Sequence, residues 1–393
     1  MDFTVSNRMS TLKGSAIREM FKAMADPTVI SLAGGNPAAE LFPSEELAQI
    51  AEEIIRENPV KALQYGISEG NIELRNKILE MMKERENINA TLDEITIVSG
   101  GQQAIEIVSK ILLNEGDSVI VEAPSFVGAL NAYRSYGANL VGVEVESDGM
   151  NIEKLKETIK NTPNVKLIYT IPNFQNPSGV TMSLEKRKAL YEIARDNGIF
   201  IIEDNPYGEL TFDGVKLPTI KSMDEAGVVL YSGSFSKILA PGLRLGYLIA
   251  PAAFTEKVVL GKQVSDVHTS LLPQLLALEF MKRYDIGELI EKMRNLYKKK
   301  CETMINAMKE YLPENITYTV PGGGLFVWCD APGIDTLKLS QLCKEEKVLI
   351  VPGNNFATDM SLENSGFRLN FSTMPDDLIV EGVKRLGNVL RKI

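Results

Sequence analysis

The chain has 393 residues, with 42 lysines and arginines against 52 aspartates and glutamates, and a formal net charge of -10. This balance, without a concentrated basic tract, argues against a protein that binds a nucleic-acid backbone. No apolar run approaches the roughly 18 residues of a membrane span, and the N-terminal MDFTVSNRMSTLKG lacks the apolar core of a signal peptide, so we expect a cytoplasmic protein.

The chain contains only three cysteines and one histidine, which limits the chemistry available to it. The cysteines (Cys301, Cys329 and Cys343) are far from any C-x-x-C spacing and fit a reducing compartment. Zinc sites usually take several histidine or cysteine ligands, so we expect no metal site. With His268 as the lone histidine, the acid–base group of an enzyme is expected to be a lysine or a carboxylate.

The first part of the chain is expected to be helical, with helices near 8–25, 44–57 and 70–86. Residues 95–250 then alternate strand-like apolar runs with helical patterns such as QQAIEIVSKILLN and SLEKRKALYEIARDN. The strand-like runs are EITIVSG, DSVIVEAP, NLVGVEV, KLIYTIP, IFIIEDN, VVLYSGS and LGYLIA. This alternation predicts an α/β fold with a mostly parallel sheet that helices cover on both faces.

A long helical stretch near 284–312 separates this block from a C-terminal part of different character. That part holds the strand-like TYTVPGGGLFVWCD, KVLIVPG and GFRLNFS and a final helix near 376–391. We therefore predict an N-terminal arm at 1–40, a large α/β domain at 41–280 and a smaller α+β domain at 281–393.

Polar residues gather where the predicted strands end. SGGQQA ends the first run, PNFQNPSG the fourth, EDNPYGEL the fifth and SGSFSK the sixth. Each segment alone is a common turn or helix cap. Ligands of doubly wound sheets bind outside the carboxyl ends of the strands, so four such segments together predict a binding site there.

The polar residues at these strand ends suit a phosphorylated aldehyde. SGGQQA offers free N–H groups at a helix N-terminus, and Ser234, Ser236 and Arg244 add donors for a phosphate. The G-x-G-x-x-G and P-loop patterns are absent from the sequence, which weakens the nucleotide alternatives. Lys237 can form an imine with an aldehyde, and Asp204 can keep a ring nitrogen protonated.

In these segments the sequence resembles the fold-type I pyridoxal-phosphate enzymes, the class I/II aminotransferases. The resemblance covers almost the whole chain, through STLKGSAIREM, LAGGNPAAELFP, LQYGISEG, PNFQNPSG, EDNPYGEL, GSFSKILAPGLRLGY and GFRLNFS. It is strongest to the branch with 2-aminoadipate and kynurenine aminotransferases, relatives of the C-terminal part of GntR-type regulators. It implies pyridoxal 5'-phosphate as cofactor, a fold of one large and one small domain, and transfer of an amino group from an L-amino acid to a 2-oxo acid such as 2-oxoglutarate.

The resemblance also assigns roles in the large domain. Lys237 would hold the cofactor as an imine and move the substrate proton, and Asp204 would pair with the ring nitrogen. The ring hydroxyl oxygen would be bound by Tyr207 and Asn176. The phosphate would be bound by Gly101, Gln102, Ser234, Ser236 and Arg244.

Further roles implied by the resemblance concern the substrate and a second subunit. Arg368 would bind the substrate α-carboxylate, with the Gly35 backbone closing on it. Tyr65 would reach the phosphate in the neighbouring subunit, which implies a homodimer with shared active sites. On the N-terminal helix, Arg18, with Ser15 one turn before it, would meet the distal carboxylate of glutamate or 2-aminoadipate. The helix would swing aside for aromatic or aliphatic substrates. The alternative is that Arg18 is a solvated surface residue.

The chain departs from the family pattern at two positions. Phe126 stands where relatives usually stack a tyrosine on the cofactor ring, so the phenolic hydroxyl is lost. Gly101 stands where relatives have a serine in the phosphate turn, so one hydroxyl contact is missing.

Three alternatives stay open at this point. Ser234 and Lys237 fit the S-x-x-K motif of serine acyl-enzymes, although Pro241 and Gly242 argue against the helix that motif needs. A ligand-sensing regulator domain is disfavoured, since we expect no DNA-binding module in the roughly 30 residues before the GGNP turn. A β-lyase or a decarboxylase would use the same lysine and aspartate.

Overall fold

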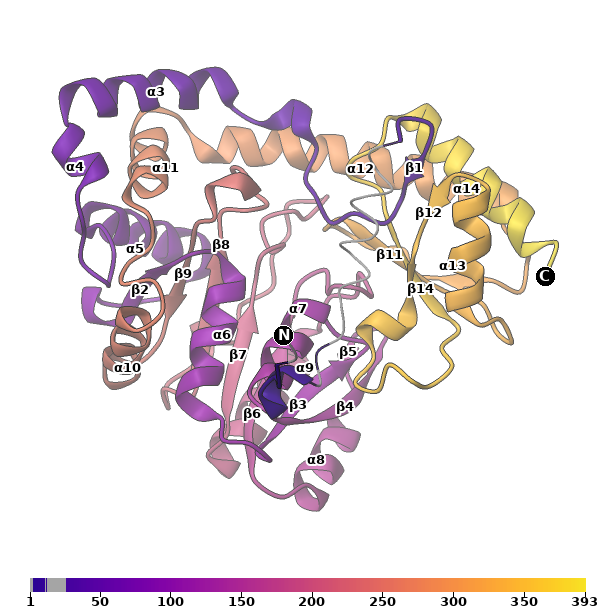
Figure 1. Cartoon of the computed structure of the whole chain (residues 1–393), viewed down its shortest axis with the longest axis horizontal. Coiled ribbons are helices and arrows are strands. Elements are labelled where there is room, and N and C mark those ends of the chain that lie inside the picture. The colour runs from indigo at the N-terminus through magenta and orange to yellow at the C-terminus, as the bar shows by residue number, and fades with distance from the viewer. Residues whose placement is uncertain (1–2, 11, 13–25) are drawn as a thin grey trace.

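The computed structural model describes residues 3–10, 12 and 26–393 (Figure 1). The helix expected near 8–25 falls mostly outside these residues, and of it only α1 (Asn7–Ser10) is described. None of the helices in the described ranges is long and apolar enough to cross a membrane.

The centre of the molecule is a sheet of eight strands, in the order β2-β9-β8-β7-β6-β3-β4-β5. Neighbouring strands from β8 through β7, β6 and β3 to β4 are parallel, whereas β9 runs antiparallel to both its neighbours and β5 antiparallel to β4. The prediction of a mostly parallel sheet is confirmed. The strands are β2 (Ile95–Val98), β3 (Ser118–Ala123), β4 (Asn139–Glu146), β5 (Gly149–Met150), β6 (Val165–Thr170), β7 (Phe200–Asp204), β8 (Val229–Ser234) and β9 (Gly246–Ile249).

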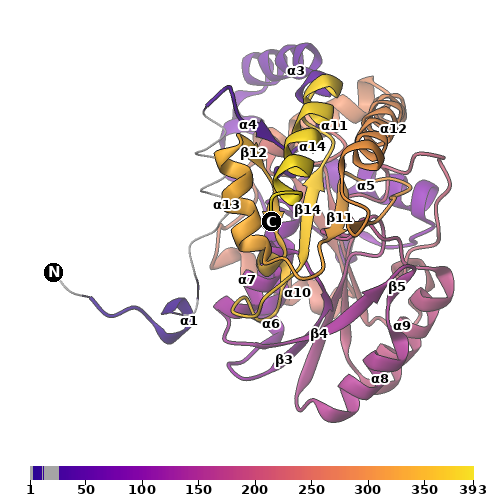
Figure 2. The ribbon, with the colours of Figure 1, turned by 90° about the vertical axis from the view of Figure 1, so that its right-hand side faces the viewer.

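Helices cover both faces of this sheet, with α6 (Gly101–Leu112) and α7 (Val127–Ser135) on one side and α8 (Ile152–Asn161) and α9 (Leu184–Asn197) on the other (Figure 2). Successive strand residues point to opposite faces. In β3, Val119 packs in the core under α6 and α7, and the next residue, Ile120, packs in the core under α8 and α9. Two buried faces explain why these strands are almost continuously apolar.

Further helices pack beside the large sheet, at its β2 end and along its rim (Figure 1). They are α3 (Ser44–Glu57), α4 (Pro59–Leu63), α5 (Ile72–Glu86), α10 (Ala252–Gln263) and α11 (Leu271–Arg283). Their ends follow local signals. The Asn71 side chain accepts from the N–H of Leu74 and caps α5, which begins two residues later than the pattern predicted.

A second, smaller sheet is antiparallel, with the strand order β10-β11-β14-β13. Its strands are β10 (Thr317–Tyr318), β11 (Phe326–Asp330), β13 (Val351–Pro352) and β14 (Gly366–Asn370), and the helices beside it are α12 (Ile286–Tyr311), α13 (Thr336–Glu345) and α14 (Asp376–Leu390). Near this part, β1 (Ile30–Ser31) pairs with β12 (Val348–Leu349). The Leu32 carbonyl, directly after β1, also accepts from the N–H of Asn370 at 2.7 Å. These contacts fix the chain after β1 beside the small sheet.

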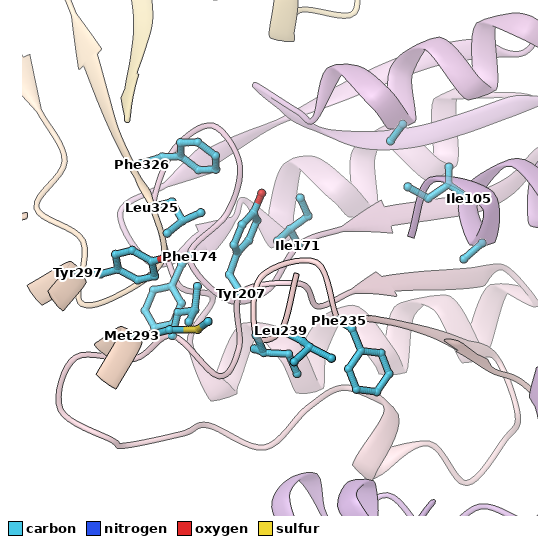
Figure 3. Packing of buried hydrophobic residues seen from close by; sticks show 14 of the residues in the cluster. Ile105, Ile171, Phe174, Tyr207, Phe235, Leu239, Met293, Tyr297, Leu325 and Phe326 are labelled. Carbon is cyan, nitrogen blue, oxygen red and sulfur yellow. The ribbon is translucent and has the colours of Figure 1, made fainter. Parts of the chain in front are cut away.

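One apolar cluster extends through both sheets, and Figure 3 shows the part of it to which α6, β11, α12 and the loops after β6, β7 and β8 contribute. Tyr207 packs edge-on against Phe326 with 5.7 Å between the ring centroids. This contact holds the loop after β7 against the small sheet, at the edge where the polar segments meet.

Candidate active site

A cavity of about 320 Å³ lies between the carboxyl ends of the large sheet's parallel strands and the small sheet. It brings together twelve of the residues that the sequence singled out. They are Gly35, Gly101, Gln102, Phe126, Asn176, Asp204, Tyr207, Ser234, Ser236, Lys237, Arg244 and Arg368.

Three other sequence-predicted residues are not in this cavity. Tyr65 lies outside it with its side chain in solvent, and 81% of the residue is exposed. Arg18 and Ser15 lie outside the described residues, so the structure leaves their predicted role untested.

Lys237 sits in a single turn directly after β8. The N–H of Leu239 donates to the carbonyl of Phe235, and a short 3-10 turn at Pro241–Leu243 follows. Because Ser234 is still the last residue of the strand, the helix required by the S-x-x-K alternative does not form. The lysine Nζ instead donates to the carbonyl of Gly35 at 2.7 Å.

The electrostatic surroundings of Lys237 favour the neutral amine. Burial of the amine, followed by the charges of Arg368 and Arg244, lowers the pKa of Lys237 to about 8. A lysine with such a pKa can act as a nucleophile or a base near neutral pH.

Asp204 ends β7 with its carboxylate buried at the cavity wall. One oxygen accepts from the Tyr169 hydroxyl at 2.9 Å and the other from the Ser232 hydroxyl at 3.1 Å. Burial raises the pKa of Asp204 to about 6, although both hydrogen bonds oppose this shift. A cationic N–H donor in the cavity would compensate the buried charge, as a protonated pyridine nitrogen does.

One end of the cavity is formed by the start of α6 and by Arg244, a set of donors suited to an anion. Gly100 precedes the helix with a φ of +81°, and a Cβ there would lie 2.6 Å from Arg244 Nη2. The positive φ and the close approach of Arg244 both favour glycine at this position. At Gly101, by contrast, a Cβ would be 3.4 Å from the Ser232 Oγ, which is ordinary contact. A side chain would therefore fit at position 101, and lack of space does not explain why this chain has glycine where relatives have serine.

Arg368 on β14 is a buried cation at the opposite wall. Its Nη1 donates to the side chain of Asn176 and its Nη2 to the carbonyl of Ala33, both at 2.7 Å, and its carbon Cζ lies 4.2 Å from the ring centre of Phe326. Burial lowers the pKa of Arg368 to about 10.

Within the described chain, Arg368 has no ion pair with a carboxylate, and its buried Nε has no hydrogen-bond partner. A buried guanidinium of this kind is costly unless a ligand supplies the negative charge. It is therefore suited to a carboxylate that enters the cavity.

Tyr207 and Asn176 stand together at the cavity wall beside Arg368. The Asn176 amide nitrogen lies 3.4 Å from the Tyr207 hydroxyl, and burial raises the pKa of Tyr207 well above its ordinary value. The phenol is therefore a neutral donor, suited to an anionic or carbonyl oxygen.

The structure adds supporting residues that sequence reasoning missed. Besides Tyr169 and Ser232, these include Glu122, which accepts from the Thr170 hydroxyl at 2.6 Å and the Gln175 amide at 3.0 Å. Burial raises the pKa of Glu122 to about 7. The only signal in the sequence is a polar residue inside an apolar strand, as in DSVIVEAP. Six further residues line the cavity without having been predicted: Ala33, Gly34, Asn36, Ile171, Pro206 and Phe326.

A doubly wound sheet with an enclosed lysine beside a buried acid, facing an anion-binding helix end, defines an enzyme that binds a phosphorylated carbonyl cofactor. Residues 27–386 match the family model of the aminotransferases of class I and II. The chain belongs to this family and is a pyridoxal-phosphate-dependent aminotransferase. The fold and enzyme class expected from the resemblance are confirmed.

The chain is similar along its whole length to characterised aminotransferases. It is 39% identical to aromatic-amino-acid aminotransferase 1 of Thermococcus litoralis, covering 98% of this chain and 94% of that protein. It is 38% identical to 2-aminoadipate transaminase of Thermus thermophilus, covering 97% and 94%. The crystal structure of kynurenine aminotransferase from Pyrococcus horikoshii, in complex with PMP, superposes with a TM-score of 0.94 at 36% identity, covering 99% of this chain and 97% of that one.

The cavity residues fit pyridoxal phosphate in three separate respects. Lys237 offers an amine of lowered pKa for the aldehyde, and Asp204 offers a buried carboxylate for the ring nitrogen. The start of α6 and the guanidinium of Arg244, which approach as closely as glycine allows, offer donors for the phosphate.

Proposed function

We propose that the enzyme transfers the amino group of an L-amino acid to a 2-oxo acid such as 2-oxoglutarate, with Lys237 as its covalent and proton-carrying residue. One observation carries this proposal: Lys237, Asp204 and Arg368 face a single cavity, and Arg368 lacks a carboxylate partner in the described part of the chain. The three groups match the amine, the ring nitrogen and the substrate carboxylate that amino transfer requires.

Pyridoxal phosphate, when bound, supplies an electron sink for the charge that develops at the substrate α-carbon. We propose that Lys237 Nζ removes and returns the proton at that carbon. Its lowered pKa keeps a useful fraction of the amine neutral near pH 7 to 8. The carbonyl of Gly35 accepts a hydrogen bond from Nζ at 2.7 Å, which keeps the amine at the cavity wall.

The remaining cavity residues are proposed to bind and orient. Asp204 accepts from the ring nitrogen while Tyr169 and Ser232 hold its carboxylate in place. Tyr207 and Asn176 donate to the ring hydroxyl oxygen, and Phe126 packs on the ring. The phosphate is held by backbone N–H groups of Gly101 and Gln102 with Ser234, Ser236 and Arg244.

The substrate α-carboxylate is proposed to bind Arg368. A guanidinium has five N–H donors, and the bonds to Asn176 and Ala33 use two of them, which leaves the Nε–H and one N–H on each terminal nitrogen. Two parallel hydrogen bonds to a carboxylate are therefore available.

We infer that the amino donors include 2-aminoadipate, glutamate and aromatic or branched aliphatic amino acids. The names of the relatives above, an aromatic-amino-acid aminotransferase and a 2-aminoadipate transaminase, support this range. Arg18 and Ser15 are proposed to meet a distal carboxylate. The test is the Michaelis constant of Arg18→Ala, which should rise roughly tenfold for 2-aminoadipate and 2-oxoglutarate but little for leucine. Equal losses for both kinds of substrate would refute this role.

The working form is proposed to be a homodimer in which Tyr65 serves the cofactor phosphate of the partner. Tyr65 lies among exposed apolar side chains of α4, the loop after it and the start of α5, a surface suited to burial against a second copy. The exposed members are Val60, Leu63, Tyr65, Ile67 and Ile72. Sedimentation should give a dimer, and a fully active monomer would refute the shared site.

The domain boundaries remain proposals as well. We propose an arm at 1–40, a cofactor-binding domain at 41–280 and a small domain at 281–393, which begins shortly before α12 (Ile286–Tyr311). The free, buried thiols of Cys301, Cys329 and Cys343 support a reducing, cytoplasmic location.

The decisive assay for the reaction is product analysis. Purified protein is incubated with an amino acid panel and 2-oxoglutarate, and glutamate, ammonia and carbon dioxide are measured. Amino transfer predicts glutamate in equal amount to the consumed donor. Release of ammonia or carbon dioxide without glutamate would instead identify a lyase or a decarboxylase.

A further inference from the structure

The lone histidine of the chain contacts the segment that carries Tyr65. The N–H of Gly66 donates to His268 Nε2 at 3.2 Å, and His268 Nδ1 lies 2.9 Å from the carbonyl of Thr269. Since a carbonyl only accepts, Nδ1 carries the proton and Nε2 is free to accept, which is what the bond to Gly66 requires. The rings of Tyr65 and His268 also meet edge-on, with 5.9 Å between centroids and an interplanar angle of 88°.

The backbone next to this histidine adopts a costly conformation. Val267 has a φ of +65°, a left-handed value that a β-branched residue rarely takes. Its N–H donates to the carbonyl of Lys262 at 2.9 Å, and the N–H of His268 donates to the carbonyl of Asp266 at 2.7 Å. Such strain persists only where the surrounding structure requires it. Here it turns the chain sharply after α10, so that His268 faces Gly66.

The same segment is anchored on its other side to the chain's own phosphate turn. Asp266 accepts from the side-chain amide of Gln103 at 2.7 Å, and Lys262 Nζ lies 3.0 Å from the oxygen of that amide. Gln103 in turn accepts from the N–H of Ser99 at 2.7 Å. The histidine is therefore held on a rigid base rather than on a free loop.

Tyr65 needs such support, because its environment in the single chain gives it little. Its side chain is exposed, and its hydroxyl makes no hydrogen bond within the described residues. A tyrosine that must meet a phosphate across a subunit boundary loses side-chain and backbone entropy when it binds. Contacts that fix it beforehand reduce this loss.

We propose that His268 is a positioning residue that presents Tyr65 to the cofactor phosphate of the partner subunit. It acts through the Gly66 hydrogen bond and the ring contact, without itself touching the cofactor. The inference rests on the proposed homodimer with shared sites. It assigns a role to a residue that the reaction itself does not use.

The test measures the affinity of the cofactor-free dimer for pyridoxal phosphate and for pyridoxal, which lacks the phosphate. His268→Leu removes the acceptor and should weaken pyridoxal phosphate roughly tenfold, the effect of about one hydrogen bond, while pyridoxal binding changes little. His268→Gln keeps an acceptor and should restore most of the affinity. Ser265→Ala is the matched control, since Ser265 lies in the same segment and contacts Lys110 and Gly261 instead. It should bind both compounds like the wild type.

The Tyr65→Phe background separates the inference from the proposed function. If His268 acts through Tyr65, Tyr65→Phe alone weakens pyridoxal phosphate, and adding His268→Leu weakens it little further. If Tyr65→Phe has no effect, the shared site is wrong and the inference falls with it. If Tyr65→Phe weakens the cofactor but His268→Leu does not, the positioning role alone is overturned. Equal weakening of both compounds by His268→Leu would also overturn it, because that result indicates a general structural role.

Mixed dimers test whether His268 of one subunit, acting through Tyr65, affects cofactor binding in the cavity of the other subunit. A chain with Lys237→Ala and His268→Leu is exchanged with wild-type chains, so that one intact cavity receives Tyr65 from the altered chain. That cavity should release pyridoxal phosphate faster than the intact cavity of a dimer whose altered chain carries only Lys237→Ala. Equal release rates would contradict the proposal.

Discussion

Replacing Arg368 tests how the enzyme recognises the α-carboxylate that all its proposed substrates share. In the structure, Arg368 keeps three N–H donors beyond those bound to Asn176 and Ala33, which is enough for a two-pronged bond. Arg368→Lys keeps the charge but offers only one direct bond. Arg368→Met removes both the charge and the donors at similar length.

The expected loss of kcat/KM follows from the number of hydrogen bonds that each substitution removes. A hydrogen bond to a charged group contributes about 1.5–3 kcal/mol, and each 1.36 kcal/mol is tenfold in rate. Arg368→Lys should therefore lower kcat/KM roughly 10- to 150-fold, and Arg368→Met on the order of 10²- to 10⁴-fold. The loss should be alike for acidic and apolar amino acids, since both carry the α-carboxylate.

The assay is steady-state transamination with glutamate and leucine as donors, with the affinity for pyridoxal phosphate and the melting temperature measured alongside. Cofactor affinity should change far less than kcat/KM, because Arg368 faces the substrate side of the cavity. A variant that keeps kcat/KM within threefold would refute the assignment. So would a loss that follows cofactor affinity or stability alone.

Three further predictions concern the cofactor side of the cavity. Asp204→Asn keeps the size of the side chain but loses its charge, so binding of pyridoxal phosphate in a spectroscopic titration should weaken roughly 10- to 150-fold; unchanged affinity and turnover would show that Asp204 does not face the ring nitrogen. Because the folded chain lowers the pKa of Lys237 to about 8, the cofactor-free protein should gain stability as pH rises above about 8 and should capture pyridoxal phosphate faster as pH rises through that value. Arg368→Met removes a positive neighbour and should move the capture midpoint to higher pH, and a midpoint that stays or falls would contradict this electrostatic account. Gly100→Ala places a Cβ 2.6 Å from Arg244 Nη2 and should weaken the cofactor more than Gly101→Ala, where there is room; the reverse order in the same titration would argue against the phosphate site.

Much of the fold can be predicted from the sequence, because strands that are buried on both faces of a sheet appear as continuous apolar runs. The seven apolar runs between 95 and 250 correspond to β2, β3, β4, β6, β7, β8 and β9 with ends shifted by a few residues, and the stretch near 284–312 corresponds to α12. Polar segments at successive strand ends predicted a shared site, since carboxyl ends of parallel strands meet at one edge. The two-residue β5 was too short to show in the apolar pattern.

The supporting contacts could not be predicted in the same way. Tyr169 and Ser232 lie on β6 and β8, and only the strand order places both beside Asp204 on β7. The contact between His268 and Gly66 joins positions 202 residues apart in sequence. Such pairs depend on how elements pack, which local periodicity does not encode.

The most direct test of the central claim is to trap the cofactor on the protein. The purified enzyme, loaded with pyridoxal phosphate, is reduced with borohydride, digested and mapped by mass spectrometry. The account predicts one labelled peptide, from the segment SGSFSK, with the phosphopyridoxyl mass on Lys237, and no label in Lys237→Ala. Label on another lysine in the native enzyme, or a loaded enzyme that takes up no label, would contradict it.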